Sequence, residues 1–215
     1  MVEIPLILKL KKQVHKDIAR AQDIIVKEVY AVFDKATMHG GTSIWRCYNG
    51  NRFSEDIDMY LTKDINKIGL LFENLKRNGF IIKKEKIGEK SLYSNLEINR
   101  TTVRFEALFR KYDGHLKEYL TSDGNFITIY TLTPEELIKE KVAAYLKRYK
   151  IRDLYDIFFL LRYSQEDVSQ DLRKLVNNYK DPVDEKELKV LIIEGLVPST
   201  LKMVDYIRKW EKKNI

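Results

Sequence analysis

The sequence is poor in the residues that build disulfide scaffolds and transition-metal sites. Its 215 residues include one cysteine, Cys47, and three widely spaced histidines. A single cysteine allows neither an intrachain disulfide nor a cysteine-based zinc site, and the histidine spacing argues against a histidine-rich one. Because Cys47 lies beside Trp45 and Tyr48, we interpret it as a packing residue rather than a nucleophile. Any metal chemistry must therefore depend on carboxylates, which suit Mg²⁺ or Mn²⁺.

Long apolar runs, glycine and proline are scarce as well. No apolar run exceeds the length of Ile157–Leu161, which is far too short to cross a membrane, and the N-terminus lacks the features of a secretory signal. With 9 Gly and 4 Pro the chain is neither collagen-like nor of low complexity, and 13 Tyr, 9 Phe and 2 Trp supply a core. We therefore expect a folded, cytoplasmic protein of one large or two small domains.

The charge of the chain is moderately basic. Its 39 Lys and Arg residues exceed its 32 Asp and Glu residues, which gives a formal net charge of +7. This excess fits a polyanionic partner such as a nucleotide or RNA, but it fits a solvated, lysine-rich surface nearly as well. The same two interpretations apply to the basic clusters at 83–86, 110–111 and 147–150.

Hydrophobic periodicity divides the chain into two parts. In the first part, helical spacing over the first forty residues and over 65–77 alternates with strand-like patterns. The predicted strands are 56–61, 80–87, 92–98, 102–109 and 126–130. Asn99-Arg100 predicts a tight hairpin, and 42–48 predicts one or two helical turns. This part is therefore α+β, with about five strands.

A strong helix-start signal opens the second part. Thr133-Pro134-Glu135-Glu136 supplies a capping hydroxyl, a proline at the first helical position and a glutamate at the third, which together predict a capping box. The helices predicted from there on are 135–149, 151–163, 168–179, 185–196 and 199–213. We place the domain boundary near residue 132, between an α+β domain (1–132) and a helical domain (133–215).

Two stretches of the first part carry chemistry. On a strand, residues two apart share a face, so Asp56 and Asp58 project together and favour a cation between them. Upstream, Gly40-Gly41-Thr42-Ser43 offers unobstructed backbone N–H groups to a phosphate. Each motif is common by chance, but their order and closeness supply the parts for phosphoryl or nucleotidyl transfer.

These motifs resemble the DNA polymerase β-like nucleotidyltransferase superfamily, and in particular its AbiEii/AbiGii toxin family. The family pattern G-G-[TS] followed by R-[FL]-S-x-D-[IL]-D is similar to Gly40–Thr42 and Arg52–Asp58, although the loop between them is longer than usual. Lys141 on the capped helix and Arg152–Asp156 resemble the family's later motifs. The resemblance covers roughly residues 38–61, 97–108 and 134–160.

The resemblance implies a nucleotidyltransferase-type mixed β-sheet with helices, followed by a C-terminal helical domain, with the active site between the two. Asp56 and Asp58 would bind Mg²⁺ or Mn²⁺, with Glu106 as the third carboxylate and Glu97 as its alternative. The implied nucleotide-binding residues are Gly40, Gly41, Thr42, Ser43, Arg52 and Lys141, and Asp153 is an implied catalytic residue. Without the resemblance, Lys141 is a snorkelling lysine and Asp153 a charge at a helix start.

The implied activity is Mg²⁺-dependent transfer of a nucleoside monophosphate (NMP) from an NTP to an acceptor hydroxyl, with release of pyrophosphate. RNA, in particular a tRNA 3′ end, is the expected acceptor, and the expected biological role is that of a toxin with a cognate antitoxin encoded nearby. We expect no membrane partner. Two alternatives stay open: a GTP- or RNA-binding module without turnover, and a nucleotidyltransferase that modifies small molecules of the antibiotic type.

Overall fold

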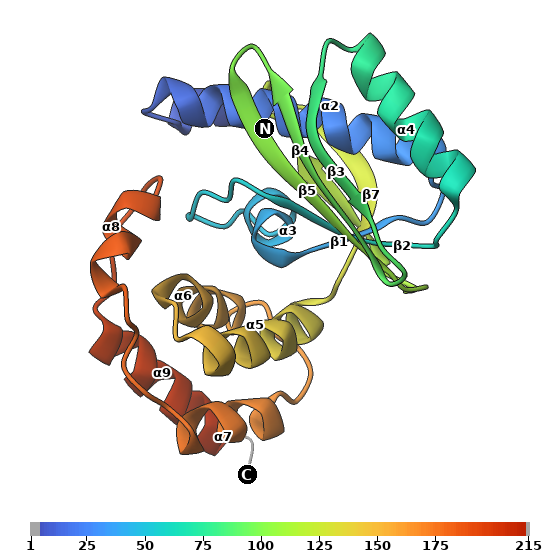
Figure 1. Cartoon of the computed structure of the whole chain (residues 1–215). Coiled ribbons are helices and arrows are strands. Elements are labelled where there is room, and N and C mark those ends of the chain that lie inside the picture. The colour runs from blue at the N-terminus through green and yellow to red at the C-terminus, as the bar shows by residue number, and fades with distance from the viewer. Residues whose placement is uncertain (1–4, 214–215) are drawn as a thin grey trace. The chain divides into compact units, whose positions relative to one another are not determined.

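The computed structural model describes residues 5–213, and it divides the chain into two compact units. One unit extends to Asn49 and resumes over Phe53–Thr131, and the other contains Gly50–Arg52 and the chain from Leu132 onward. Figure 1 shows the whole chain, coloured from blue at the N-terminus to red at the C-terminus. The α+β fold class with a helical C-terminal region is confirmed.

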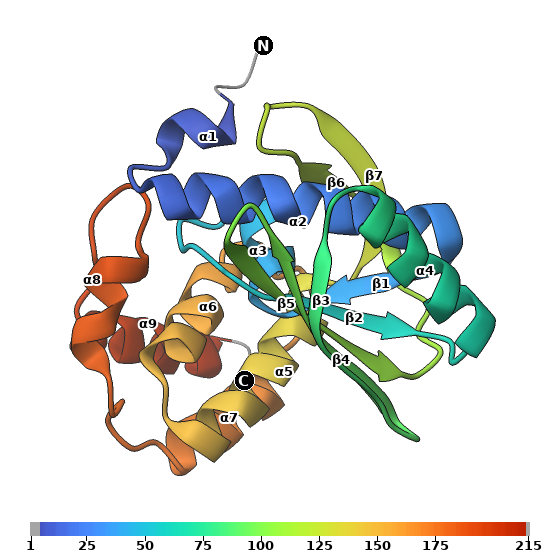
Figure 2. The same ribbon diagram turned by 45° about the horizontal axis from the view of Figure 1, so that its top comes forward.

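A mixed sheet forms the centre of the first unit (Figure 2). Its strands are β1 (Thr37–His39), β2 (Ile57–Leu61), β3 (Ile81–Ile87), β4 (Ser91–Ile98), β5 (Thr101–Phe109), β6 (His115–Leu120) and β7 (Phe126–Thr131). They are ordered β3-β4-β5-β2-β1-β7-β6. The β2–β5 and β1–β7 pairs are parallel and the other pairs are antiparallel.

The expectation of about five strands was wrong, because the described residues form seven. The sequence pattern missed β1, whose three residues are too few to show an alternation. It also missed β6, in which only Tyr119 and Leu120 are buried. The hairpin at Asn99-Arg100 is confirmed: it joins β4 to β5, and both residues have positive φ, 49° and 65°, as in a two-residue turn of type I′.

The two faces of this sheet differ in chemistry. Helices α2 (Gln13–Val32) and α4 (Ile65–Arg77) lie along one face (Figure 2). In β2, Ile57 and Met59 are completely buried, whereas Asp58 between them is only half-buried. Alternation along β2 therefore puts Asp58 and Tyr60 on the opposite face, which we call the polar face. Two further helices complete the unit, α1 (Leu6–Lys9) and α3 (Gly40–Cys47).

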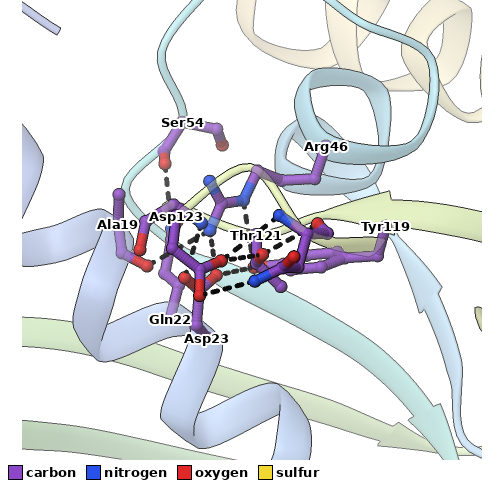
Figure 3. Close-up of polar contacts among 10 residues, drawn as sticks. Ala19, Gln22, Asp23, Arg46, Ser54, Tyr119, Thr121 and Asp123 are labelled. Atoms are coloured by element: carbon purple, nitrogen blue, oxygen red, sulfur yellow. Dashed lines mark hydrogen bonds and ion pairs between the residues drawn. The ribbon is translucent and has the colours of Figure 1, made fainter. Parts of the chain in front are cut away.

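A buried ion pair joins α2 to α3 (Figure 3). Arg46, which is 1% exposed, pairs with Asp23, donates to the carbonyl oxygen of Ala19 and donates through Nε to the Tyr119 hydroxyl at 3.0 Å. Asp23 also accepts from the Tyr119 hydroxyl at 3.0 Å and from the backbone N–H of Ser122 at 2.7 Å. Burial raises the pKa of Tyr119 well above its ordinary value, so the phenol stays neutral and acts as a donor to Asp23.

The second unit is helical, as the sequence predicted. Its elements are α5 (Pro134–Arg148), α6 (Ile151–Leu160), α7 (Ser169–Asn177), the 3₁₀ turn η1 (Glu185–Glu187), α8 (Leu188–Leu191) and α9 (Thr200–Lys213). The capping box is confirmed: Glu136 N–H donates to Thr133 Oγ1 at 3.2 Å, and Thr133 N–H donates to Glu136 at 2.9 Å. The predicted helix 185–196 was too long: α8 ends at Leu191, because Ile192 is extended and forms a β-bridge with Arg52. Over residues 5–213, no helix is both long and apolar enough to cross a membrane.

Residues Gly50–Arg52 join the second unit through their own contacts. Arg52 forms an antiparallel bridge with Ile192, and Ile193 N–H donates to the Asn51 carbonyl oxygen at 2.8 Å. The chain therefore passes from the first unit to the second after Asn49, returns before Phe53, and passes over again at Leu132.

Candidate functional site

Neighbouring strands place the predicted carboxylates Asp58 and Glu106 in one row on the polar face. Asp58 of β2 is opposite His39 of β1 on one side and Glu106 of β5 on the other, and Glu106 is opposite Tyr93 of β4. Adjacent strands are about 5 Å apart, so Asp58 and Glu106 are direct cross-strand neighbours. Asp56 directly precedes β2, and its carboxylate contacts Arg104 of β5, which also contacts Glu106. The structure thus places the three predicted metal-binding carboxylates at neighbouring positions.

An arginine on β5 lies between these carboxylates. Arg104 Nη2 is 2.5 Å from Asp56 Oδ2, and Arg104 Nε is 3.1 Å from Glu106 Oε1. Partial burial opposes protonation of Arg104, but the charges of Asp56, Glu106 and Asp58 outweigh it and raise its pKa. Partial burial raises the pKa of Glu106; Arg104 opposes this increase, and Asp58 and Asp56 add to it. The sequence interpretation missed Arg104. This residue precedes Glu106 by two positions in β5 and therefore shares its face of the strand.

The donor set fits a hard divalent cation by its chemistry. Mg²⁺ and Mn²⁺ prefer carboxylate oxygens, which Asp58 and Glu106 carry on adjacent strands and Asp56 carries just before β2. Within the described part of the chain, however, no three acidic, histidine or cysteine side chains are already gathered as a metal-ligand group. A cation bound here would compete with Arg104 for Asp56 and Glu106.

The predicted phosphate-binding segment lies directly beside these carboxylates. β1 passes into α3 through Gly40, whose φ is +74°, and a Cβ added there would overlap Asp58 Oδ2. Thr42 donates to the Asp56 carbonyl oxygen, and the Ser43 hydroxyl is 2.5 Å from that of Thr131. Both hydroxyls are therefore engaged within the protein, and both side chains are buried. Contact of a phosphate with the backbone N–H groups of the first turn of α3 stays a prediction. The N-terminus of α3 favours an anion at this point.

The remaining predicted residues form a buried cluster within the second unit. Arg52 binds Asp156 through two bonds of 2.8 Å, and Lys141 Nζ is 2.7 Å from Asp156 and 3.7 Å from Asp153. Arg148, which the sequence interpretation placed only in a basic cluster, binds Asp153 at 2.7 and 2.8 Å. Burial raises the pKa of Asp156, but the charges of Arg52 and Lys141 outweigh it and lower that pKa. The roles of Arg52, Lys141 and Asp153 with a nucleotide stay predictions.

Comparison with protein families identifies the class of protein that this fold and site define. The chain matches the family described as nucleotidyl transferase AbiEii toxin, type IV toxin–antitoxin system, over residues 27–197. The protein therefore belongs to the AbiEii family and is a nucleotidyltransferase, as the order of its motifs predicted. A search of curated proteins finds no match.

Solved structures support this assignment at the level of the fold. JHP933 from Helicobacter pylori is 25% identical, with a TM-score of 0.62 over 95% of this chain and 94% of that one. A candidate nucleotidyltransferase from H. pylori is 23% identical, with a TM-score of 0.65 over 94% and 96%. MenT4, a nucleotidyltransferase toxin from Mycobacterium tuberculosis, is 17% identical, with a TM-score of 0.60 over 92% and 82%.

Replacing Gly40 by alanine is expected to lower the rate of nucleotidyl transfer by about 100-fold, because the new Cβ displaces the Asp58 carboxylate. A positive φ adds backbone strain of about 1 kcal/mol. Gly69→Ala is the control: Gly69 lies in α4 with no atom within 4 Å of its added Cβ, and this change should stabilise the fold. Steady-state kinetics and thermal melting of both variants test this, and a fully active Gly40→Ala variant would contradict it.

Proposed function

We propose that the protein transfers an NMP from an NTP to a hydroxyl of RNA, with a tRNA 3′ end as the acceptor, and that it requires Mg²⁺ or Mn²⁺. The observation that carries this proposal is that Asp58 and Glu106 lie opposite each other on adjacent strands, with Asp56 just before β2 and Gly40 of α3 beside Asp58. The net charge of +7 favours a polyanionic acceptor. The cytoplasm, where NTPs and tRNA occur, is the proposed location, and a cognate antitoxin encoded nearby is the proposed partner.

Each part of the site has a role in this reaction. The acceptor oxygen forms a bond to the α-phosphorus, the bond to the bridging oxygen breaks, and pyrophosphate leaves with that electron pair. The backbone N–H groups at the start of α3 bind the departing phosphates. Asp56, Asp58 and Glu106 would hold the divalent cation, which stabilises the charge on the transferring phosphoryl group. Glu106, whose pKa is raised, accepts the hydroxyl proton.

Incorporation of label from each α-³²P-labelled NTP into total tRNA with Mg²⁺ tests the proposal. Label on tRNA that disappears with EDTA and in the Asp56→Ala/Asp58→Ala variant is the expected result. Nucleotide binding without incorporation into any RNA would overturn the proposal and favour a binding module. Incorporation into an aminoglycoside but not into RNA would overturn the acceptor and favour a small-molecule nucleotidyltransferase.

Glu106→Gln is expected to lower kcat by about 10²- to 10³-fold, because it removes one negative oxygen ligand and the proton acceptor together. Glu97→Gln is the matched control and should stay close to the wild-type rate. Glu97 is opposite Thr102 rather than Asp58, and its carboxylate is 3.2 Å from Lys83 Nζ. Single-turnover rates of the two variants decide which glutamate is the third carboxylate, and a loss confined to Glu97→Gln would reverse the assignment.

A further inference from the structure

Beside the carboxylates, three aromatic rings form a continuous stack in the first unit. The His39 and Tyr60 rings lie 4.1 Å apart between centroids with an interplanar angle of 5°. Tyr60 stacks in turn on Tyr112, at 5.1 Å and 16°. The guanidinium carbon of Arg110 is 5.6 Å from the centroid of Tyr60 and 5.2 Å from that of Tyr112. We call His39, Tyr60, Tyr112 and Arg110 the ring column.

The ring column and the phosphate-binding segment both begin beside Asp58, at His39 and Gly40, and extend from there in opposite directions along β2. Thr42, at the start of α3, bonds the backbone of Asp56, before the first residue of β2. Tyr60 follows Asp58 by two residues on the same face, which corresponds to about 7 Å along an extended strand. His39 is opposite Asp58, so the column begins level with the carboxylates and extends towards the C-terminal end of β2.

This geometry resembles a platform for nucleobases more than a packed core. The central ring, Tyr60, is 6% exposed, whereas His39 and Tyr112 at the two ends are partly exposed. Parallel rings with an arginine against their faces bind unpaired bases through stacking and cation–π contacts, without needing a particular base sequence. A small apolar or amine-bearing acceptor has no comparable use for a stack of this length.

The in-line geometry of the reaction favours the ring column as the binding site of the acceptor rather than of the leaving pyrophosphate. In phosphoryl-group transfer, the attacking and leaving oxygens are roughly in line on opposite sides of the phosphorus. With the pyrophosphate at the start of α3, the attacking hydroxyl approaches from the side of Tyr60 and Tyr112. We infer that the ring column binds the unpaired terminal nucleotide of the RNA acceptor, with Arg110 against its base or phosphate. This inference rests on the proposed function and specifies how its acceptor is recognised.

The test uses an oligoribonucleotide with a tRNA acceptor-end sequence and 2-aminopurine as its terminal base, whose fluorescence is quenched by stacking. Wild-type protein should quench it, and Tyr112→Leu and Arg110→Gln should each weaken binding by about tenfold, with the KM for NTP unchanged. Tyr112→Phe, which keeps the ring, should restore the affinity lost in Tyr112→Leu. Tyr93→Leu is the control, because Tyr93 lies on the other side of Glu106, opposite it on β4. Thermal melting checks the fold of each variant.

The outcomes separate this inference from the proposed function. If Tyr112→Leu and Arg110→Gln bind and label RNA like the wild type, the ring column is not the acceptor site, while the proposed activity stands. A raised KM for NTP with unchanged RNA binding would also overturn the inference, because the column would then hold the base of the NTP. If the wild-type protein neither labels nor binds RNA, both the inference and its RNA acceptor are wrong.

Discussion

Replacing Asp58 by asparagine is expected to lower the rate of NMP transfer by about 10³-fold, equivalent to about 4 kcal/mol of transition-state stabilisation. Asp58 is the central carboxylate of the row, opposite Glu106 and His39 and in contact with the backbone at Gly40. Asparagine keeps its shape but not its charge, so it cannot balance a divalent cation at this point. Single-turnover transfer at saturating NTP measures the effect.

Glu55→Gln provides the matched control for Asp58→Asn. Glu55 is an exposed acid only three residues away, and the structure describes no ion pair for it. Its loss removes the same charge from the same segment, so activity close to wild type is expected. The fold of Asp58→Asn should be retained, because the substitution relieves repulsion among neighbouring carboxylates. An Asp58→Asn variant with more than about a tenth of the wild-type rate would contradict the assigned role.

Asp23→Ala is expected to lower the free energy of unfolding by about 3–5 kcal/mol, the largest effect on stability among these changes. The substitution leaves the Arg46 guanidinium buried without its counter-ion and removes the acceptor of Tyr119 and of the Ser122 N–H (Figure 3). The cost comes from the uncompensated buried charge rather than from the attraction of the pair alone. Urea denaturation followed by circular dichroism gives the value.

Asp17→Ala on the same helix makes the comparison specific. Asp17 also pairs with an arginine, Arg20, at 3.1 Å, but the two side chains are 37% and 56% exposed. Exposed pairs contribute below about 1 kcal/mol, so only a small change is expected. If Asp23→Ala and Asp17→Ala lose similar free energies of unfolding, burial of the Asp23–Arg46 pair does not determine how much it stabilises the fold.

Local sequence signals predicted the parts of the site that depend on local geometry. The alternating pattern at 56–61 predicted β2, which begins one residue later, at Ile57, and the Thr133 capping box sets the start of α5. Those signals need only a few adjacent residues. The family assignment followed because several such local motifs occur in one order, and the family comparison confirmed it.

The contacts that the sequence did not predict depend on the register between distant strands. Arg104 meets Asp56 because β5 pairs in parallel with β2, and the stacking of His39 on Tyr60 requires β1, a strand too short to be recognised. No pattern within one segment carries this information. The overlong helix predicted at 185–196 has the same cause, because the helix ends where Ile192 becomes extended and pairs with the distant Arg52.

The route of the chain between the two units limits how the protein can be divided genetically. Expression of 133–215 alone would omit Arg52, which belongs to the second unit and binds Asp156 there through two hydrogen bonds. Conversely, a fragment that ends at 132 would contain Gly50–Arg52 without the rest of the second unit, to which these residues belong. Truncations at this boundary would therefore produce insoluble or unstable pieces, so failure of either half to act alone says nothing about which half holds the chemistry. A more informative experiment mixes the two halves as separate chains and measures whether nucleotidyl transfer is restored.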